Sequence, residues 1–478
     1  MNVAQKQSPL ASKGTHIMQR QKVTAVFDIG KTNKKFFLFD DDYNEVHREY
    51  TSFDEIEDED GHPTENLTEL KKWLLSVFDS VLNAKKFNIK KINFSTYGAS
   101  FVHIDANGKV LTPLYNYLKP IPSEVVQKFH SHHGDATEIA TDTASPTSGM
   151  LNSGMQLFWL KETRPEIFEK IKYSLHFPQY LSYLFTGIPL SEYTSIGCHT
   201  GLWDYNKKDY HHWVYAEGLH SVLPPIVPTQ TSIKIDYKGK KYAVGVGIHD
   251  SSAALIPYLL SEKKPFLLLS TGTWSVALNP FNDEPLTTKD LKNNCLNYMS
   301  VDGKRIKATR FFMGNEYKLQ VKNISDHFQK PYGYHQGIKF NSDIYHKLIS
   351  REDIHFHFES ILLKRKEIER TQLAAFATFE EAYHQLMIEL MQLQFETIKM
   401  AIGNTSIKKI YIDGGFTDNH IFVTLMANHF KDHKVRTTRS PLGSALGAAM
   451  VIGNQKLDRR FLKNNYKLQK LVPLQTTN

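Results

Sequence analysis

The amino-acid sequence predicts an α/β protein with two similar domains that face one another across a central cleft. The chain has 478 residues, of which 41% are hydrophobic, enough for more than one domain with a buried core. Each half of the chain opens with an apolar strand, a turn of small residues and a second apolar strand, at residues 27–33 and 269–273. Each half also closes with a strand, a glycine turn and a helix, at residues 245–250 and 411–415. This weak internal repeat would place four turns around one cleft, where small ligands usually bind.

The first half is expected to form a sheet with helices against it. Residues 23–30 and 35–39 are predicted strands because they are runs of β-branched, aliphatic and aromatic residues. The acidic run at residues 54–60 is expected to be a solvated loop. Further elements are a helix over 70–82, a strand over 91–95 and a short buried helix over 177–184 that ends at Thr186-Gly187.

The second half begins after a predicted boundary at Pro257 and the polar stretch 261–264. The expected division is a disordered basic tail (1–22), an N-terminal domain (23–257), a C-terminal domain (258–455) and a basic C-terminal segment (456–478). The predicted elements around and after the boundary are a strand over 242–247, a helix over 251–256, strands within 266–278, a long amphipathic helix over 371–402, a strand over 409–412 and a helix from about 418.

The basic charge of the chain belongs to its two ends. The net charge is +8, of which residues 1–22 carry +4 and residues 456–478 carry +5, so that the body carries −1. A protein that reads a nucleic-acid duplex concentrates cations on a structured face. The distribution therefore argues against a nucleic-acid partner, and polybasic ends are expected to aid solubility.

A cytoplasmic location is expected. The first 22 residues are polar and lack the apolar core of a signal peptide, and no run approaches the length of a membrane-spanning helix. Cys198 and Cys295, the two cysteines, are too few for a disulfide framework.

Two turns of small residues could bind phosphate. The turns at Gly30 and Gly272 would expose backbone N–H groups that a phosphate can approach closely. Asp28 ends the first strand and would then reach Mg²⁺ through water. Each turn alone also fits an ordinary hairpin. A P-loop is rejected, because position 25 is Ala and no helix pattern follows.

Asp250 is the candidate general base. It follows a glycine-containing strand and precedes an Ala-rich helix start, so it would either cap that helix or take a proton from a substrate hydroxyl group. Phosphoryl transfer requires mostly positioning and neutralisation of charge, so one well-placed carboxylate is enough. His249 beside it could hydrogen-bond a sugar hydroxyl group or be structural.

Other chemistry has less support. His130, His132 and His133, and likewise His211 and His212, are expected at solvated helix ends rather than in a zinc site. No nucleophile elbow surrounds a serine, and no G-x-G-x-x-G follows a strand, which argues against a dinucleotide oxidoreductase.

Six stretches in order resemble the FGGY family of carbohydrate kinases, and within it the rhamnulokinase group. They are Asp28–Asn33, Thr96–Gly98, Gly247–Asp250, Leu269–Ser275, Asp413–Asn419 and Leu442–Ala449. The resemblance implies two duplicated RNase H-like domains of the actin, hexokinase and Hsp70 type that flank a cleft. It also implies phosphorylation of a terminal hydroxyl group of a ketose, with ATP and Mg²⁺.

The resemblance also implies roles for individual residues. Asp250 would be the catalytic base and Asp28 the residue near Mg²⁺. The residues that would line ATP and its phosphates are Asp28, Lys31, Thr32, Asn33, Thr271, Gly272, Thr273, Gly414, Gly415 and Asn419. The residues of the sugar pocket would be Tyr97, Gly98, Ser100 and His249.

Departures from the rhamnulokinase pattern concern the sugar and the nucleotide turn. Ser100 stands where the group has Asp, and the stretch Tyr115–Lys119 lacks the group's two arginines and its acid. Asp413 and Phe416 replace residues usual in the glycine-rich turn. When a pocket lacks charged hydrogen-bond partners, it can bind a different set of sugar hydroxyl groups. The departures therefore argue against L-rhamnulose itself as the substrate.

The expected function is therefore an ATP-dependent sugar kinase, rhamnulokinase-like, that acts as a monomer or homodimer on a small sugar, without nucleic acid or membrane. One alternative keeps the reaction and changes the acceptor to xylulose, fuculose or glycerol. The other is a non-catalytic sugar or nucleotide sensor on the same fold. Asp250 argues against a sensor, because binding alone needs no base.

Overall fold

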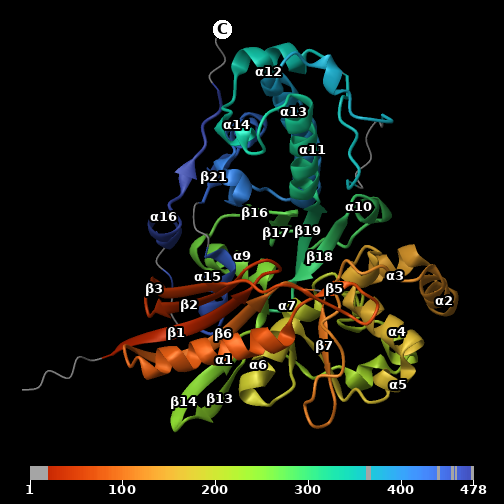
Figure 1. The fold of residues 1–478 in the computed structure, drawn as a ribbon, viewed down its shortest axis with the longest axis vertical. Helices are drawn as coiled ribbons and strands as arrows, with labels where there is room; N and C mark the ends of the chain where they lie inside the picture. Colours follow the sequence, from red (N-terminus) through yellow and green to blue (C-terminus); the bar gives the residue numbers. More distant parts are fainter. Residues whose placement is uncertain are drawn as a thin grey trace, which may run out of the picture.

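Two seven-stranded sheets, one in each half of the chain, form the framework of the structure (Figure 1). The computed structural model describes residues 20–98, 100–351, 353–361, 368–438, 442–453, 457 and 460–474. The first sheet has the order β13-β14-β6-β1-β2-β3, with β15 added beside β6. The second sheet has the order β18-β19-β17-β16-β20-β21-β22.

The strands of the first sheet are β1 (Gln21–Ile29), β2 (Lys34–Asp40), β3 (Glu45–Thr51), β6 (Phe87–Thr96), β13 (Ser232–Tyr237), β14 (Lys240–Gly245) and β15 (Ile248–His249). Those of the second are β16 (Phe266–Thr271), β17 (Ser275–Asn279), β18 (Cys295–Met299), β19 (Arg305–Phe311), β20 (Lys409–Gly414), β21 (Lys434–Thr437) and β22 (Gln469–Lys470).

The two sheets share one topology, which confirms the predicted duplication. In the first, β1, β2 and β3 pair antiparallel, while β6 and then β14 run parallel to β1. In the second, β16, β17 and β19 pair antiparallel, while β20 and then β21 run parallel to β16. The turns at Gly30 and Gly272 therefore occupy equivalent places, between the first two strands of each sheet.

Successive side chains along the first strand of each sheet point to opposite faces, and each face packs against different helices. Residues 25, 27 and 29 of β1 pack against α1 (Leu67–Asn83), and residues 267 and 269 of β16 pack with α13 (Phe379–Ile402). Val26 on the other face of β1 and Leu268 of β16 share one core with α9 (Asp250–Ser261) and α15 (Gly443–Val451). These two helices therefore lie between the sheets and join the two halves of the molecule.

α9 and α15 touch backbone to backbone at one glycine. A Cβ atom built on Gly447 would lie 1.8 Å from the carbonyl oxygen of Ala253, so no other residue fits at this crossing. α15 also binds the first sheet, because Asn93 Nδ2 donates to the carbonyl oxygen of Ala448 at 2.7 Å. The start of α9 is thus fixed against both sheets.

A helical insertion lies beside the first sheet and has its own core, which includes Phe129, Trp159 and Trp213. Its helices are α2 (Ser123–His133), α3 (Ala136–Asp142), α4 (Ser153–Thr163), α5 (Pro165–Phe168) and α8 (His212–Ala216). Outside this core, α6 (Phe177–Thr186) packs on the first sheet, and α7 (Tyr193–Ile196) contacts β15 and β18. Short strand pairs brace the loops of this half: β4 (Ile56–Glu57) with β5 (Pro63–Thr64), β7 (Phe101–Ile104) with β8 (Tyr173–His176), β9 (Ser191–Glu192) with β12 (Ile226–Val227), and β10 (Trp203–Asp204) with β11 (Asp209–Tyr210). Figure 1 shows α2 to α5 at the right, below the second sheet.

The remaining helices belong to the second half: α10 (Thr288–Lys292), α11 (Met313–His327), α12 (Ser342–Ile349), α14 (His420–His429) and α16 (Phe461–Asn465). The Leu and Met stripe of α13 is buried, as expected for core. Among the described residues, no helix has the length and apolar character needed to cross a membrane. Cys198 and Cys295 are both buried free thiols.

Several local expectations were wrong. The helix expected from residue 371 begins at Phe379, because Thr378 caps it by accepting the N–H of Glu381. α9 continues through Pro257 to Ser261, so the expected domain boundary falls within a helix.

The acidic run at residues 54–60 is not a solvated loop throughout. The carboxylate of Asp58 is fully buried and lies 2.7 Å from Lys119 Nζ, which also binds Asp60 at 2.6 Å. Arg164 also binds Asp60. The hydrogen bonds from Lys119 and Arg164 lower the pKa of the Asp60 carboxyl group to about 2. The run therefore ties the loop after β3 to the helical insertion.

The basic C-terminal segment is folded in its described part. Phe461, Leu462 and Tyr466 are buried in the core shared by the two sheets, and β22 pairs with the edge strand β21. The segment folds because its apolar residues are buried, and a count of its charges could not predict this. Most of the N-terminal tail, residues 1–19, lies outside the described residues.

Candidate active site

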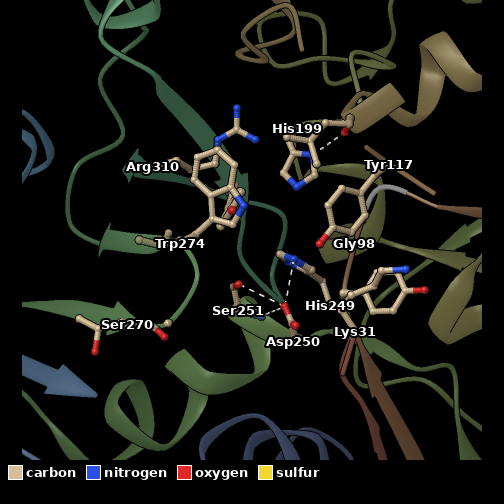
Figure 2. A pocket seen from close by; sticks show the side chains of 16 residues that line it. Lys31, Gly98, Tyr117, His199, His249, Asp250, Ser251, Ser270, Trp274 and Arg310 are labelled. Carbon is tan, nitrogen blue, oxygen red and sulfur yellow. Dashed lines mark hydrogen bonds and ion pairs between the residues drawn. The ribbon is translucent and has the colours of Figure 1, made fainter. Parts of the chain in front are cut away.

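A cavity of about 280 Å³ opens between the two halves, and the catalytic candidate Asp250 lies on its wall. Figure 2 shows the side chains that converge on it. Seven of the residues predicted for the site line this cavity: Lys31, Tyr97, Gly98, His249, Asp250, Thr271 and Gly272. The other lining residues are Tyr117, Leu151, His199, Ser251, Ser270, Trp274, Val276, Tyr298 and Arg310.

Asp250 is the first residue of α9, and its neighbour His249 occupies the N-cap position without a side-chain cap. The carboxylate accepts the N–H of Ser251 at 2.5 Å and lies 3.3 Å from His249 Nε2. Withdrawal from solvent raises the pKa of Asp250 to about 6, against hydrogen bonds from Ser251 and the charge of Lys35 that lower it. Asp250 therefore does not cap the helix, and its basicity suits a proton acceptor near neutral pH.

His249 is buried against Gly98, the residue that the sequence placed in the sugar pocket. A Cβ atom at Gly98 would lie 2.8 Å from Cys198 Sγ and 3.0 Å from His249 Cδ2, so the position requires glycine. Burial lowers the pKa of His249 to about 4, which keeps the imidazole neutral. A neutral imidazole can both donate and accept a hydrogen bond, as a sugar hydroxyl group requires.

Asp28 ends β1 beside the same end of the cleft. Ser444 Oγ, at the start of α15, donates to Asp28 Oδ1 at 2.9 Å, and Lys35 Nζ lies 3.6 Å from Asp28 Oδ2. Burial raises the pKa of Asp28, and the nearby charge of Asp250 raises it further. Asp28, Asp250 and Lys35 thus lie close together. The sequence analysis predicted both carboxylates for the site but did not predict Lys35.

The turn that follows Asp28 is held from behind by a buried lysine. Lys34 Nζ donates to the carbonyl oxygens of Gly30 and Lys31 at 3.2 and 3.1 Å, and pairs with Glu65 at 2.8 Å. These two carbonyl oxygens are therefore already bonded to Lys34, on the inner side of the turn. Lys31 itself pairs with Glu55 at the edge of the cavity.

The second phosphate turn is fastened to the glycine turn of β20. Thr271 Oγ1 donates to the carbonyl oxygen of Asp413 at 2.6 Å and accepts the N–H of Phe416 at 3.2 Å. Gly414 has φ +93°, and a Cβ atom there would lie 1.8 Å from the carbonyl oxygen of Thr271. The structure thus brings the two predicted nucleotide turns into direct contact.

Other predicted residues lie outside the cavity wall. Thr32, Asn33, Thr273, Gly414 and Gly415 belong to the three turns beside it, after β1, β16 and β20. Asn419 caps α14 by accepting the N–H of Phe422, and its amide donates to Tyr383.

Ser100 is buried, and its hydroxyl group faces the carbonyl oxygen of Tyr115 at 3.5 Å, so it does not reach the cavity. Lys119, from the same departing stretch, is engaged by Asp58 and Asp60. Of the residues that depart from the rhamnulokinase pattern, Ser100 and Lys119 therefore have structural contacts away from the cavity, whereas Tyr117 lines it.

Sequence reasoning missed the side of the cavity formed by Tyr117, His199, Tyr298 and Arg310. His199 and Tyr298 lie outside every motif, and only the fold brings their strands and loops together. Trp274 belongs to the stretch Leu269–Ser275 and follows two residues predicted to bind phosphate, Gly272 and Thr273. This position could have indicated that Trp274 lines the cavity.

The histidine clusters have different fates. His130, His132 and His133 form the last turn of α2, as predicted, and His133 pairs with Glu217, which also binds Lys161. His211 is buried and caps α8, so the expectation of a solvated helix end was wrong there.

A cleft between two duplicated α/β domains, with a carboxylate between two glycine-containing turns, agrees with the predicted fold of the actin and hexokinase type. Residues 23–251, just under half of the chain, match the N-terminal domain of the FGGY family of carbohydrate kinases. The chain is 25% identical over 256 residues to a rhamnulokinase of Oceanobacillus iheyensis, a match that covers 50% of this chain and 52% of the relative. The match thus spans about half the length of that curated relative.

Solved structures share the whole fold. A carbohydrate kinase from Novosphingobium aromaticivorans superposes with a TM-score of 0.78 at 23% identity and covers 96% of both chains. A ligand-bound xylulose kinase from Lactobacillus acidophilus has a TM-score of 0.77 at 16% identity, with 95% of this chain and 94% of that chain covered. At these identities the likeness establishes the fold of both domains.

Proposed function

We propose that the protein transfers the γ-phosphoryl group of ATP to a terminal hydroxyl group of a monosaccharide, with Asp250 as the general base. The observation that carries the proposal is the position of Asp250, on the wall of the interdomain cavity, between the turns of the two sheets and the imidazole of His249. A neutral ketose of the rhamnulose type is the acceptor that sequence similarity favours.

The reaction follows from this placement. Asp250 accepts the proton of the hydroxyl group while its oxygen forms a bond to the γ-phosphorus atom, and the bond to the β-phosphate oxygen breaks to release ADP. His249 donates to or accepts from the same sugar and fixes its orientation. Lys35, which lowers the pKa of both Asp28 and Asp250, supplies positive charge beside the transferred group.

The residues present fit Mg²⁺, which the family implies. Asp28 offers carboxylate oxygens, the ligand type that Mg²⁺ prefers, and its burial beside a second carboxylate would be compensated by a cation. Asp28 would hold the ion through water, and the ion would neutralise phosphate charge. The N–H groups of Gly30 and Gly272 are bonded within their own turns, so the N–H groups that would hold the phosphates are those of Lys31, Thr32, Asn33 and Thr273. Thr271 and Gly272 would line the phosphates, and the Gly414–Asn419 turn would hold the nucleoside.

Another ketose or a polyol is the second candidate for the acceptor. It is favoured by Ser100 and Lys119, because neither residue lines the cavity and the sugar therefore meets a different wall. The cytoplasmic location and the monomeric or homodimeric state expected from the sequence stay predictions. A sensor without catalysis is disfavoured by the presence of Asp250 on the cavity wall, because binding alone needs no base.

The test is ADP release by the full chain with ATP and Mg²⁺, across a panel of ketoses, polyols and sugar acids. The expected result is turnover stimulated at least about tenfold by one or more acceptors. Absence of stimulation by every acceptor would contradict the kinase proposal.

A further inference from the structure

Arg310 places a buried positive charge on the cavity wall that the proposed reaction does not use. It belongs to β19, opposite Val276 of β17, and only 4% of the residue is exposed. Its guanidinium group lies 5.5 Å from the centre of the Trp274 ring and lines the cavity. Guanidinium groups stay charged at every physiological pH, so this charge is permanent.

The charge has no counter-ion in the part of the chain that the structure describes. Arg310 Nη2 donates to Ser148 Oγ at 3.3 Å and to Asn294 Oδ1 at 3.0 Å, and both partners are neutral. Nε is buried and without a partner among the described residues, and no described carboxylate forms an ion pair with the group. A buried charge without a partner is costly, so such a group is retained where a ligand supplies the opposite charge.

Arg310 lies at the end of the cavity away from Asp250. Figure 2 shows its guanidinium group near His199 and Trp274, with Asp250 across the pocket. The charge of Arg310 acts on Tyr298 and His199, whereas the cation that acts on Asp250 is Lys35. The ring centre of Tyr298 lies 5.3 Å from that of His249, the neighbour of Asp250, and 6.1 Å from that of His199.

This separation distinguishes two possible anions. The transferred phosphoryl group must lie beside Asp250, where Lys35 and the two turns already meet it. An anion at Arg310 must therefore belong to the far end of the acceptor. The remaining cavity residues there, His199 and Tyr298, are neutral hydrogen-bonding groups suited to hydroxyl groups, since burial keeps the pKa of His199 well below its usual value.

We propose that the acceptor is a sugar acid, whose carboxylate binds Arg310 while the hydroxyl group at its other end faces Asp250. This inference rests on the proposed phosphoryl transfer, and it replaces the neutral ketose that sequence similarity favours with aldonates, uronates and related acids. Charge-assisted hydrogen bonds from the free N–H groups of Arg310 would pair the buried cation. Neutral ketoses, including those of the rhamnulose type, would leave it unpaired and would be the poorer acceptors.

The experiment compares matched acceptors by ADP release from the full chain. D-Gluconate and D-glucitol share one carbon chain and differ in the carboxylate, as do D-galactonate and galactitol; L-rhamnulose and D-xylulose complete the panel. For the wild type, at least one acid should exceed its neutral counterpart and the ketoses by about tenfold or more in kcat/KM. Arg310→Met should lower kcat/KM for that acid by about 100-fold or more, mainly through KM, and change that for neutral acceptors less than about threefold.

Two controls separate recognition from folding. Arg305→Met removes an exposed guanidinium group from the same strand and should leave the preference for acids unchanged. Thermal unfolding of Arg310→Met should occur at or above the wild-type temperature, because an unpaired buried charge is removed; a structural arginine would give a clear loss. Arg310→Lys should restore part of the activity on the acid.

The outcomes are distinct. If neutral ketoses are phosphorylated as well as or better than every acid, or if Arg310→Met lowers both kinds of acceptor equally, the sugar-acid proposal is wrong and the kinase proposal stands. If no acceptor of either kind stimulates ADP release, the kinase proposal and this refinement both fail.

Discussion

At the scale of single residues, the site depends on how burial adjusts two ionisable groups that are adjacent in the chain. Asp250 has its pKa raised to about 6 and His249 has its pKa lowered to about 4, both chiefly by desolvation. At pH 7 the carboxylate is thus ionised and the imidazole neutral. One group can take a proton while the other only orients the substrate.

This assignment predicts a pH dependence. Because Asp250 acts only when ionised, kcat/KM should fall as the pH drops through about 6, by about tenfold for each further pH unit. His249 would not contribute above pH 5, since its own pKa is about 4. Initial rates between pH 5 and 8 with saturating ATP check this, and a rate that stays flat down to pH 5 would rule out Asp250 as the titrating base.

Glycine positions show how the sequence constrains an element. Gly414 and Gly415 are adjacent in the turn after β20, yet only Gly414 has a positive φ and a close neighbour, the carbonyl oxygen of Thr271. Gly415 has no atom within 4 Å of a Cβ atom. The two positions therefore form a matched pair.

Gly414→Ala should lower the free energy of unfolding by at least about 1–3 kcal/mol and weaken ATP binding, because the strained turn would separate from Thr271. Gly415→Ala should change stability by less than about 0.5 kcal/mol. Denaturant unfolding and the KM for ATP measure both effects. Equal behaviour of the two variants would mean that the contact between the turns is unimportant.

Much of this element-level structure was predictable from the sequence, and the exceptions have physical causes. Runs such as 266–278 and 409–412 gave correct strands because their apolar residues are continuous and bounded by turns. The start of α13 was missed because the capping Thr378 outweighs the apolar pattern before it. The buried pair Asp58–Lys119 was missed because its partners are far apart in sequence.

The candidate site was predictable where residues follow a strand directly. Asp28, Asp250 and Thr271 each stand at or directly after the end of a strand; Asp250 and Thr271 line the cavity, and Asp28 lies beside Asp250 behind its wall. Arg310 and His199 reach the same cavity from the middle of a strand and from a loop, and nothing local distinguishes them. In the proposed function these residues would face the sugar, which is why the reaction was easier to infer than the acceptor.

At the scale of the whole molecule, α9 and α15 connect the catalytic carboxylate to both sheets. Asp250 begins α9, and Ser444 at the start of α15 binds Asp28, so movement of one half relative to the other would move these carboxylates together. The C-terminal residues Phe461 and Tyr466 belong to this shared core.

The two basic ends should therefore behave differently. Deletion of residues 1–20, which precede β1, should leave kinase activity and the unfolding temperature unchanged within error. Deletion from residue 460 onward should lower the unfolding temperature strongly, because it removes buried Tyr466 and β22. Activity and thermal unfolding of the two truncations check this, and a large loss of activity in the first would mean that the tail takes part in catalysis.

The most direct test of the central claim is the turnover of Asp250→Asn on the best acceptor, measured by ADP release with ATP and Mg²⁺ at pH 7.5. The account predicts a loss in kcat of about 10²–10⁴-fold with the KM for ATP changed little. The unfolding temperature at this pH should be equal or higher, because the raised pKa makes the ionised carboxylate a cost to folding above pH 6. A variant that is folded and retains wild-type kcat would contradict the account.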